Sequence, residues 1–196
     1  MEGRMGFGDK TEEVIRGVTQ TIKQLTKDQS AQCFISPRIA EEIRGFFEDP
    51  HQQFLKDFLG SVTIKSPDLN TIQFPATVFA QYVEENRTRA YRGMTVAEEE
   101  IQKAGNMFMG KEILGKKEFQ MTVGTIIKGF RERFRNATRV GYIDSLGDLD
   151  LIMLAKEQNG SVVTTDEGLL RWARICGVKE IPASVWGEKI RQMCLK

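Results

Sequence analysis

The sequence predicts an α/β protein with a parallel sheet, flanking helices and an inserted, projecting helical hairpin. Helix and strand patterns alternate through the last third of the chain, as they do in parallel sheets. The middle third instead carries two long, charge-rich helical patterns with no strand between them. We therefore predict a domain formed by residues 1–75 and 139–196, interrupted by a hairpin over residues 76–138.

The first 75 residues predict two short extended segments among helices. A helix is expected to begin at Asp9, because apolar residues then recur at helical spacing as far as Leu25. Residues 33–36 form a short apolar run before Pro37, which is typical of a buried strand leading into a helix over residues 39–47. An amphipathic helical stretch over 54–59 precedes an extended segment over 62–70.

The middle of the chain predicts the hairpin. A helical pattern runs from about residue 75 to 103, and Gly93 within it suggests a kink or a turn. Residues 106–117 lack periodicity and predict a loop, and a second helix is expected over 119–138. Both helices carry too much charge to lie in a core on every side, which favours two helices packed against each other and projecting from the domain.

The last third predicts two further strands. A helix over 149–158 should end at Gly160, after which residues 161–165 form a buried strand. A second helix over 169–175 leads into a last strand over 178–181. Right-handed crossovers between such strands give a parallel sheet.

Composition narrows the possible chemistry. The 28 basic residues nearly balance the 27 acidic ones, so net charge does not indicate a partner. Three widely separated cysteines argue against a disulfide framework and favour the cytoplasm. His51 is the only histidine, which excludes a typical zinc site and a Ser-His-Asp triad. No apolar run is long enough to span a membrane.

Four aspartates cluster in the short segment from residue 141 to 169: Asp144, Asp148, Asp150 and Asp166. Asp166 follows the predicted strand directly, at the carboxyl end where α/β proteins bind ligands. Asp144 and Asp148 are four residues apart and would share one face of a helix, whereas Asp150 points elsewhere. Carboxylates gathered in this way repel one another unless a cation lies between them.

A cation site and simple helix capping are both consistent with these aspartates. Carboxylates without histidine or thiolate suit Mg²⁺ or Mn²⁺, which can activate water for cleavage of a phosphodiester. Asp144 and Asp148 are also good residues for the start of a helix, and any one of them alone is explained by capping. The set of Asp144, Asp148 and Asp166 favours a metal site, with Asp150 beside it.

The residues around this cluster resemble a known family. The stretch RERFRNATRVGYIDSLGDLDLIMLAKEQNG, followed by SVVTTDEGLLRWA and preceded by RGMTVAEEEIQKAG, resembles the HARP type of minimal protein-only ribonuclease P. This family also goes by the name RNA ligase partner and contains a PIN-like metallonuclease domain. The resemblance covers the chain from about Cys33 onward.

The resemblance implies an Mg²⁺-dependent endonuclease that removes the 5′ leader from precursor tRNA. It implies that Asp144, Asp148 and Asp166 hold the metal, with Asp150 close by and also contributing to catalysis. Two arginines of the RERFR motif match positions that the family needs for activity, namely Arg131 and Arg135. They lie four residues apart, on one helix face, where both can contact phosphate.

The resemblance also gives the hairpin a role. In HARP proteins a projecting helical spike mediates self-association and helps to measure the tRNA, so we expect a homo-oligomer. A basic and aromatic cluster in the first helix is compatible with phosphate contact or with an ordinary exposed helix face: Arg87, Arg89, Tyr91 and Arg92. Glu42 matches an acidic position of many PIN domains, although a surface glutamate explains it as well.

One departure from the family keeps other functions open. PIN domains open with an apolar strand that ends in an aspartate, whereas this sequence opens with MEGRMGFG, so we expect that strand to be absent. The alternatives are a PIN-domain ribonuclease with another RNA substrate, or a non-catalytic RNA-binding partner protein. Failure of the hairpin to oligomerise would favour the first alternative, and the absent strand favours the second.

Overall fold

The computed structural model describes residues 10–28, 31–110, 115–139, 141–143 and 145–187. The chain divides into two compact units. The first unit, which we call the body, comprises Met1–Phe74 and Ile143–Lys196, and the second, which we call the hairpin, comprises Pro75–Tyr142. No helix among the described residues is long and apolar enough to cross a membrane.

The body is an α/β unit in which all described strands pair in parallel. Strand β1 (Phe34–Ile35) pairs with β2 (Thr63–Ile64), and β3 (Ser161–Thr164) pairs with β4 (Lys179–Pro182). The predicted α/β class and the parallel pairing are thus confirmed. The described strands form two separate pairs, whereas the sequence predicted one continuous sheet.

Helices accompany these strands in the described part of the body. They include α1 (Thr11–Lys27), α2 (Pro37–Gly45), α3 (Gln53–Ser61), α6 (Leu146–Glu157) and α7 (Glu167–Ile175). Helix α1 packs on α3, burying Ile22 and Leu25 together with Phe54, Leu55 and Phe58. The Asp9 position expected at the start of α1 lies outside the described residues; Lys10 is the first residue before the helix.

A second core joins α6, α7, β3 and β4, which contact one another. Its fully buried side chains include Ile152, Leu154 and Trp172. Helix α6 begins three residues earlier than the predicted residue 149, because Ser145 caps it by accepting a hydrogen bond from Asp148 N. This earlier start places Asp148 inside the first turn of the helix.

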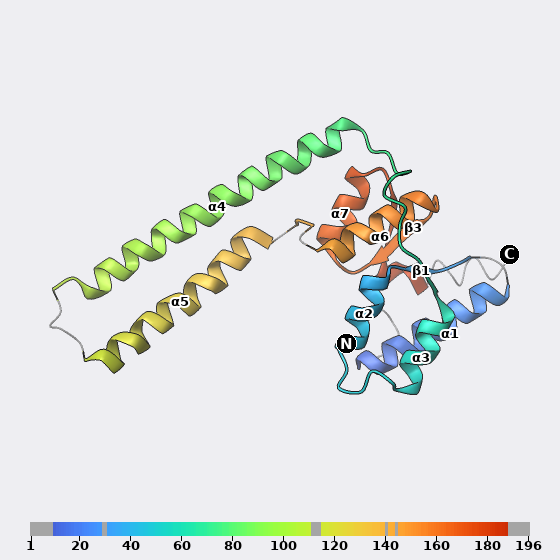
Figure 1. Ribbon diagram of the computed structural model, residues 1–196, viewed down its shortest axis with the longest axis horizontal. Helices are drawn as coiled ribbons and strands as arrows, with labels where there is room; N and C mark the ends of the chain where they lie inside the picture. The colour runs from blue at the N-terminus through green and yellow to red at the C-terminus, as the bar shows by residue number, and fades with distance from the viewer. Residues whose placement is uncertain (1–9, 29–30, 111–114, 140, 144, 188–196) are drawn as a thin grey trace. The chain divides into compact units, whose positions relative to one another are not determined.

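The hairpin consists of two long helices that lie side by side in Figure 1. Helix α4 (Ala76–Phe108) and helix α5 (Lys116–Arg139) contact each other along their length. The predicted kink at Gly93 is wrong, since α4 is continuous through it. A Cβ atom at this position would lie 2.6 Å from the Phe134 ring, so glycine is needed for close packing of the two helices rather than for a bend.

An ion-pair cluster joins the two hairpin helices at mid-length. Arg133 of α5 donates to both Glu99 and Glu100 of α4, and the Arg133 Nη1 to Glu100 Oε1 distance is 2.6 Å. The Glu100 side chain is only 4% exposed, whereas Arg133 is 46% exposed. The hydrogen bond from Arg133 holds the pKa of Glu100 below its usual value. The cluster therefore stabilises the pairing of the helices while Glu100 is ionised.

Candidate active site

The amino-terminal end of α6 presents Asp148. Ser145 adopts an extended conformation and its hydroxyl accepts a hydrogen bond from Asp148 N at 3.1 Å. Asp148 therefore lies in the first turn of the helix, where the unpaired backbone N–H groups favour a negative charge. Asp144 lies outside the described residues, so its predicted sharing of a helix face with Asp148 stays a prediction.

Asp166 lies directly after strand β3, as predicted, and caps helix α7. Its Oδ1 atom accepts a hydrogen bond from Leu169 N at 2.7 Å, and its own N–H donates to Thr164 Oγ1 at 3.1 Å. The first bond holds the carboxylate, and the second holds the backbone of Asp166 against the end of β3. Only one carboxylate oxygen is used in the cap, which leaves Oδ2 as a possible ligand for a cation.

The connection between α6 and β3 returns the chain toward Asp148. Helix α6 ends at a reversal in which Asn159 has φ of 50° and Gly160 N donates to Ala155 O at 2.8 Å. Strand β3 then runs back against the helix that it contacts. The helix rises about 18 Å over its length and the strand about 13 Å. Asp166 therefore returns toward the end of α6 that carries Asp148.

A complete metal site is not assembled by the described residues. They contain no group of three or more His, Cys, Asp or Glu side chains that could hold a metal ion. The two described members of the predicted ligand set, Asp148 and Asp166, are hard oxygen donors of the kind that Mg²⁺ and Mn²⁺ prefer. The third predicted ligand, Asp144, is outside this part of the chain.

Asp150 lies beside these residues but has a partner of its own. Its Oδ2 atom is 3.0 Å from Nε of Arg38, in the first turn of α2. Helices α2 and α6 approach closely here, and a Cβ atom on Gly147 would lie 2.9 Å from Cδ1 of Ile39. Asp150 and Arg38 thus join two helices. The sequence pattern did not predict Arg38 as the partner of Asp150.

A sequence signal could have found Arg38. It occupies the second helical position after the short strand β1 and the buried cap Ser36, at a carboxyl strand end where ligands bind in α/β proteins. The acidic position considered on the same helix, Glu42, is exposed. Nothing in the described contacts sets it apart from an ordinary surface glutamate.

The two predicted catalytic arginines lie on α5 of the hairpin. Arg131 and Arg135 are both exposed, and Arg135 Nε donates to the backbone oxygen of Arg131 at 3.3 Å. Neither guanidinium forms an ion pair with a described residue, in contrast to Arg133 between them. Their charges therefore remain available to an anionic partner.

Arg89 differs from the expected phosphate contact, because it is engaged inside the hairpin. Its Nε atom donates to the backbone oxygen of Thr138 at 2.5 Å, and its guanidinium lies 3.6 Å from the centre of the Tyr142 ring. Burial and a hydrogen bond with Tyr82 raise the pKa of Tyr142 to about 12. Arg89 thus holds the end of α5 and the following residues against α4.

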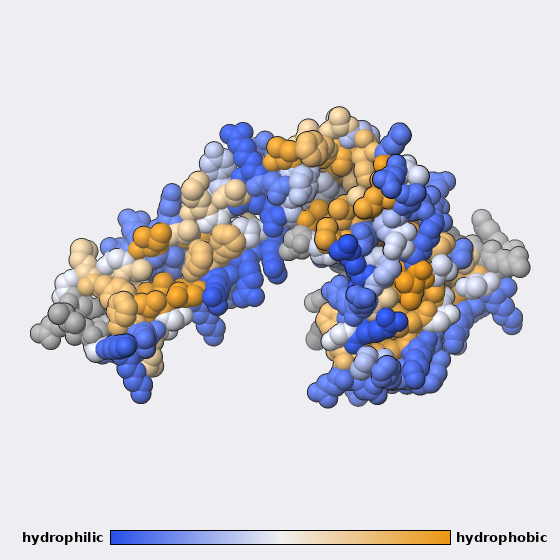
Figure 2. All heavy atoms as spheres, viewed as in Figure 1, coloured by the Kyte–Doolittle hydropathy of each residue, from blue (hydrophilic) through white to orange (hydrophobic). Residues whose placement is uncertain are grey.

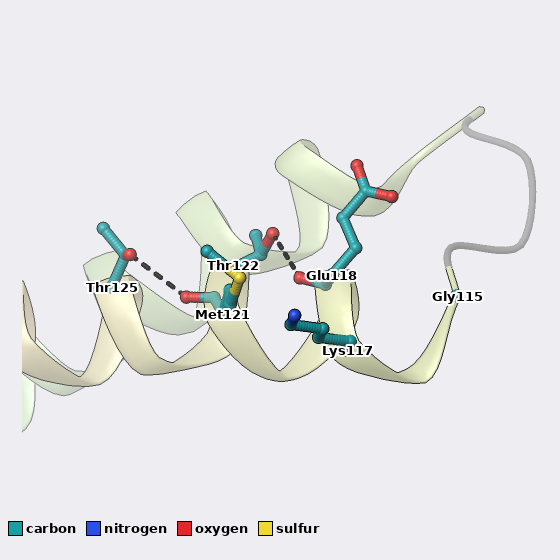
Figure 3. Close-up of a pocket in the computed structure, with 6 residues that line it drawn as sticks. All are labelled: Gly115, Lys117, Glu118, Met121, Thr122 and Thr125. Carbon is teal, nitrogen blue, oxygen red and sulfur yellow. Dashed lines mark hydrogen bonds between the residues drawn. The ribbon is translucent and has the colours of Figure 1, made fainter.

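A hollow of about 510 Å³ lies at the start of α5, and Figure 3 shows the residues that line it. The residues that line it are Gly115, Lys117, Glu118, Met121, Thr122 and Thr125. The hydroxyls of Thr122 and Thr125 donate to backbone oxygens one turn earlier in their own helix. None of the predicted catalytic residues lines this hollow, so it is not the candidate active site.

Comparison with known proteins shows the family of this chain. A family model described as a PINc domain ribonuclease matches residues 2–194. Curated relatives named RNA-free ribonuclease P include the protein of Hyperthermus butylicus, which is 35% identical over 87% of this chain and 73% of the relative. The proteins of Staphylothermus marinus and Methanocaldococcus jannaschii are each 33% identical over 82% of their length, and cover 89% and 92% of this chain.

These matches extend far beyond the acidic segment. They confirm the resemblance seen in the sequence, the PIN-like α/β class and the interpretation of the protein as a ribonuclease. They do not identify which residues act in catalysis. The chain belongs to the RNA-free ribonuclease P family of PINc-domain ribonucleases.

Proposed function

We propose that this protein removes the 5′ leader from precursor tRNA by hydrolysis of one phosphodiester bond. Membership of the RNA-free ribonuclease P family supports this substrate. The observation that carries the proposal is the return of Asp166, at the end of β3, toward the end of α6 that carries Asp148. This brings two carboxylates to the strand end where α/β proteins bind ligands.

The proposed metal ligands are Asp144, Asp148 and Asp166, and the proposed ion is Mg²⁺, with Mn²⁺ as a substitute. When bound, such an ion lowers the pKa of water and offsets the charge of the leaving oxygen. The protein contributes carboxylate oxygens as ligands. Asp148 lies in the first turn of α6, and the hydrogen bond from Leu169 N holds Asp166 in one orientation.

We also propose that Arg131 and Arg135 bind phosphates of the RNA. Both are exposed and free of ion pairs with described residues, and they lie one helical turn apart. A guanidinium binds phosphate through two parallel N–H groups, so two such residues can hold neighbouring phosphates of one strand.

The hairpin is proposed to mediate self-association. Large apolar side chains on α4 that are exposed by half or more include Phe79, Val83, Met94 and Ile101. Their spacing brings them to one side of the helix, and α5 leaves that side uncovered. Figure 2 shows apolar side chains along the hairpin. A second copy of this chain would remove this surface from water.

The reaction is proposed to take place in the cytoplasm. Cys33 and Cys176 are free thiols, and burial raises the pKa of each. Unpaired, protonated cysteines are typical of proteins kept in a reducing compartment.

Single substitutions of the aspartates test the proposed reaction. Asp166→Asn keeps the α7 cap, because asparagine caps helices as well as aspartate does, but removes the charge. Asp148→Asn is the second variant, and Asp49→Asn, at an exposed position between α2 and α3, is the control. Single-turnover cleavage of precursor tRNA in Mg²⁺ should fall on the order of a thousandfold for the first two variants only.

The same assay can also contradict the proposed reaction. Cleavage that persists in EDTA, or that is unchanged in both variants, contradicts the metal mechanism. Product mapping separates the proposed substrate from the alternative one: cuts away from the mature 5′ end would indicate a PIN-domain ribonuclease with another RNA substrate. Binding without cleavage by the unmodified chain would indicate a non-catalytic partner protein.

A further inference from the structure

Arg38 and Asp150 form an ion pair of unequal exposure. The distance from Arg38 Nε to Asp150 Oδ2 is 3.0 Å; the Asp150 side chain is 15% exposed and that of Arg38 is 57% exposed. A carboxylate that is mostly buried needs a partner of opposite charge. The arginine does not need the aspartate in the same way, because more than half of its side chain is exposed to water.

The pair leaves part of the arginine available to another group. Its closest approach joins Nε of Arg38 to Oδ2 of Asp150, and Asp150 is the carboxylate that Arg38 meets among the described residues. A guanidinium has five N–H donors, more than one carboxylate can use. Because 57% of the Arg38 side chain is exposed, donors remain for a phosphate, which a guanidinium binds through parallel hydrogen bonds. Asp150 thus holds the arginine from one side and leaves the rest of it exposed.

The pair lies where two helix starts meet. Arg38 follows strand β1 by three residues and is held by a fully buried cap, Ser36, whose hydroxyl accepts a hydrogen bond from Ile39 N. Ile39 in turn packs on Gly147 of α6, at a position where only glycine fits without movement. The start of α2 is therefore fixed against the same end of α6 that carries Asp148.

An acidic nuclease site needs positive charge near its substrate. The aspartates that suit a metal ion also repel the phosphates of RNA, and a bound cation offsets this only partly. Arg38 adds a positive group at this end of the body, besides the bound cation. Its backbone N–H lies in the first turn of α2, and the first turns of helices favour anions. Its side chain can therefore meet a phosphate that approaches the aspartates.

We propose that Arg38 binds a phosphate of the RNA substrate beside the metal site, and that Asp150 is a positioning residue that orients Arg38. This rests on the proposed ribonuclease function and assigns the role of Asp150, which acts through the arginine and leaves metal binding to the other aspartates. The competing explanation is that the pair only ties α2 to α6.

Five variants separate these explanations. They are Arg38→Gln, Arg38→Lys, Asp150→Asn, the Arg38→Gln/Asp150→Asn double variant, and the control Arg44→Gln, which makes the same change as the first at an exposed position in the last turn of α2. For each variant, binding of precursor tRNA is measured in EDTA over a range of KCl concentrations. Single-turnover cleavage is measured in Mg²⁺ over a range of enzyme concentrations. The thermal midpoint is measured as well.

The proposal predicts a specific pattern. Arg38→Gln should weaken RNA binding about tenfold and reduce the slope of log affinity against log salt by about 0.7 to 0.9, the value for one lost phosphate contact. Arg44→Gln should change neither. Asp150→Asn should weaken binding less than Arg38→Gln, and the double variant should bind no worse than Arg38→Gln alone. Arg38→Lys should restore part of the salt slope that Arg38→Gln loses, because lysine carries the same charge but lacks the paired N–H groups of a guanidinium.

Other results overturn the proposal. A lower thermal midpoint for Arg38→Gln with an unchanged salt slope would show that the pair only ties the two helices. An additional loss of binding from Asp150→Asn in the Arg38→Gln background would show that Asp150 does not act through the arginine. The proposed function fails separately, if the unmodified chain does not cleave precursor tRNA, and the binding measurements still report on Arg38 in that case.

Discussion

The body and the hairpin bury their apolar side chains very differently. Almost every buried hydrophobic residue described belongs to the body, and the hairpin contributes only Val96 and Tyr142. Exposed large hydrophobic side chains are instead concentrated in the hairpin, including Phe79 at 71% and Ile101 at 72%. The body therefore has a core of its own, whereas the hairpin has helices that meet along a narrow contact.

Polar contacts also join the two helices of the hairpin. Glu100 is buried against Arg133, and Arg89 closes the base of the two helices through Thr138 and Tyr142. Directional contacts of this kind specify how the two helices pair, but they contribute little net stability. The body can therefore hold a site in fixed geometry, whereas the hairpin has an exposed apolar surface that a partner would cover.

The largest expected effect lies in the core of the body. Leu55 is fully buried between α1 and α3, so Leu55→Ala should lower the free energy of unfolding by about 2 to 5 kcal/mol. Ile101→Ala on the exposed face of α4 should change it by less than about 0.5 kcal/mol in dilute, monomeric protein. Urea unfolding followed by circular dichroism measures both. Equal losses of unfolding free energy in the two variants would mean that the body and the hairpin do not differ in how they pack their apolar side chains.

A smaller effect is expected where the hairpin helices are closest. Gly93→Ala places a Cβ atom 2.6 Å from the Phe134 ring, which should cost about 1 to 3 kcal/mol despite the better helix propensity of alanine. Gly105→Ala in the same helix meets no atom within 4 Å and should stabilise the protein by about 0.5 to 1 kcal/mol. Thermal unfolding distinguishes them, and stabilisation by both would contradict the close contact.

The smallest effect expected is the pH dependence that the Glu100–Arg133 ion pair contributes. Arg133 holds the pKa of Glu100 below its ordinary value of 4.5, so the unfolded chain binds more protons than the folded one in acid. The contribution of this ion pair is fully present above about pH 4.5 and is lost as pH falls through the folded pKa. In the Glu100→Gln variant, the thermal midpoint should fall less between neutral pH and pH 3 than it does in the unmodified chain. An unchanged profile would exclude this pair as a source of acid sensitivity.

The sequence predicted well what depends on local pattern. The helices, the short strands and the position of Asp166 after β3 follow from apolar periodicity and from capping residues. It predicted poorly what depends on packing between segments. Gly93 suggested a kink because glycine weakens helices, but the Phe134 ring that requires glycine is about forty residues away in sequence.

The candidate site shows the same limit. Helix spacing correctly set Asp150 apart from Asp148, but its partner Arg38 belongs to a distant helix and carries no periodic signal. Arg89 illustrates the same limit. Its basic and aromatic neighbourhood was compatible with phosphate contact or with an exposed helix face, whereas in the structure its guanidinium meets Thr138 and Tyr142 of the same hairpin.

The central claim is a division of roles, in which the body carries the chemistry and the hairpin carries the assembly. Sedimentation velocity at micromolar concentration tests it most directly, with the unmodified chain, Asp148→Asn in the body and Ile101→Glu on the exposed face of α4. We predict that the unmodified chain and Asp148→Asn sediment as the same dimer or larger assembly, and that Ile101→Glu sediments as a folded monomer. A monomeric unmodified chain, or an Ile101→Glu variant that assembles fully, would contradict the account.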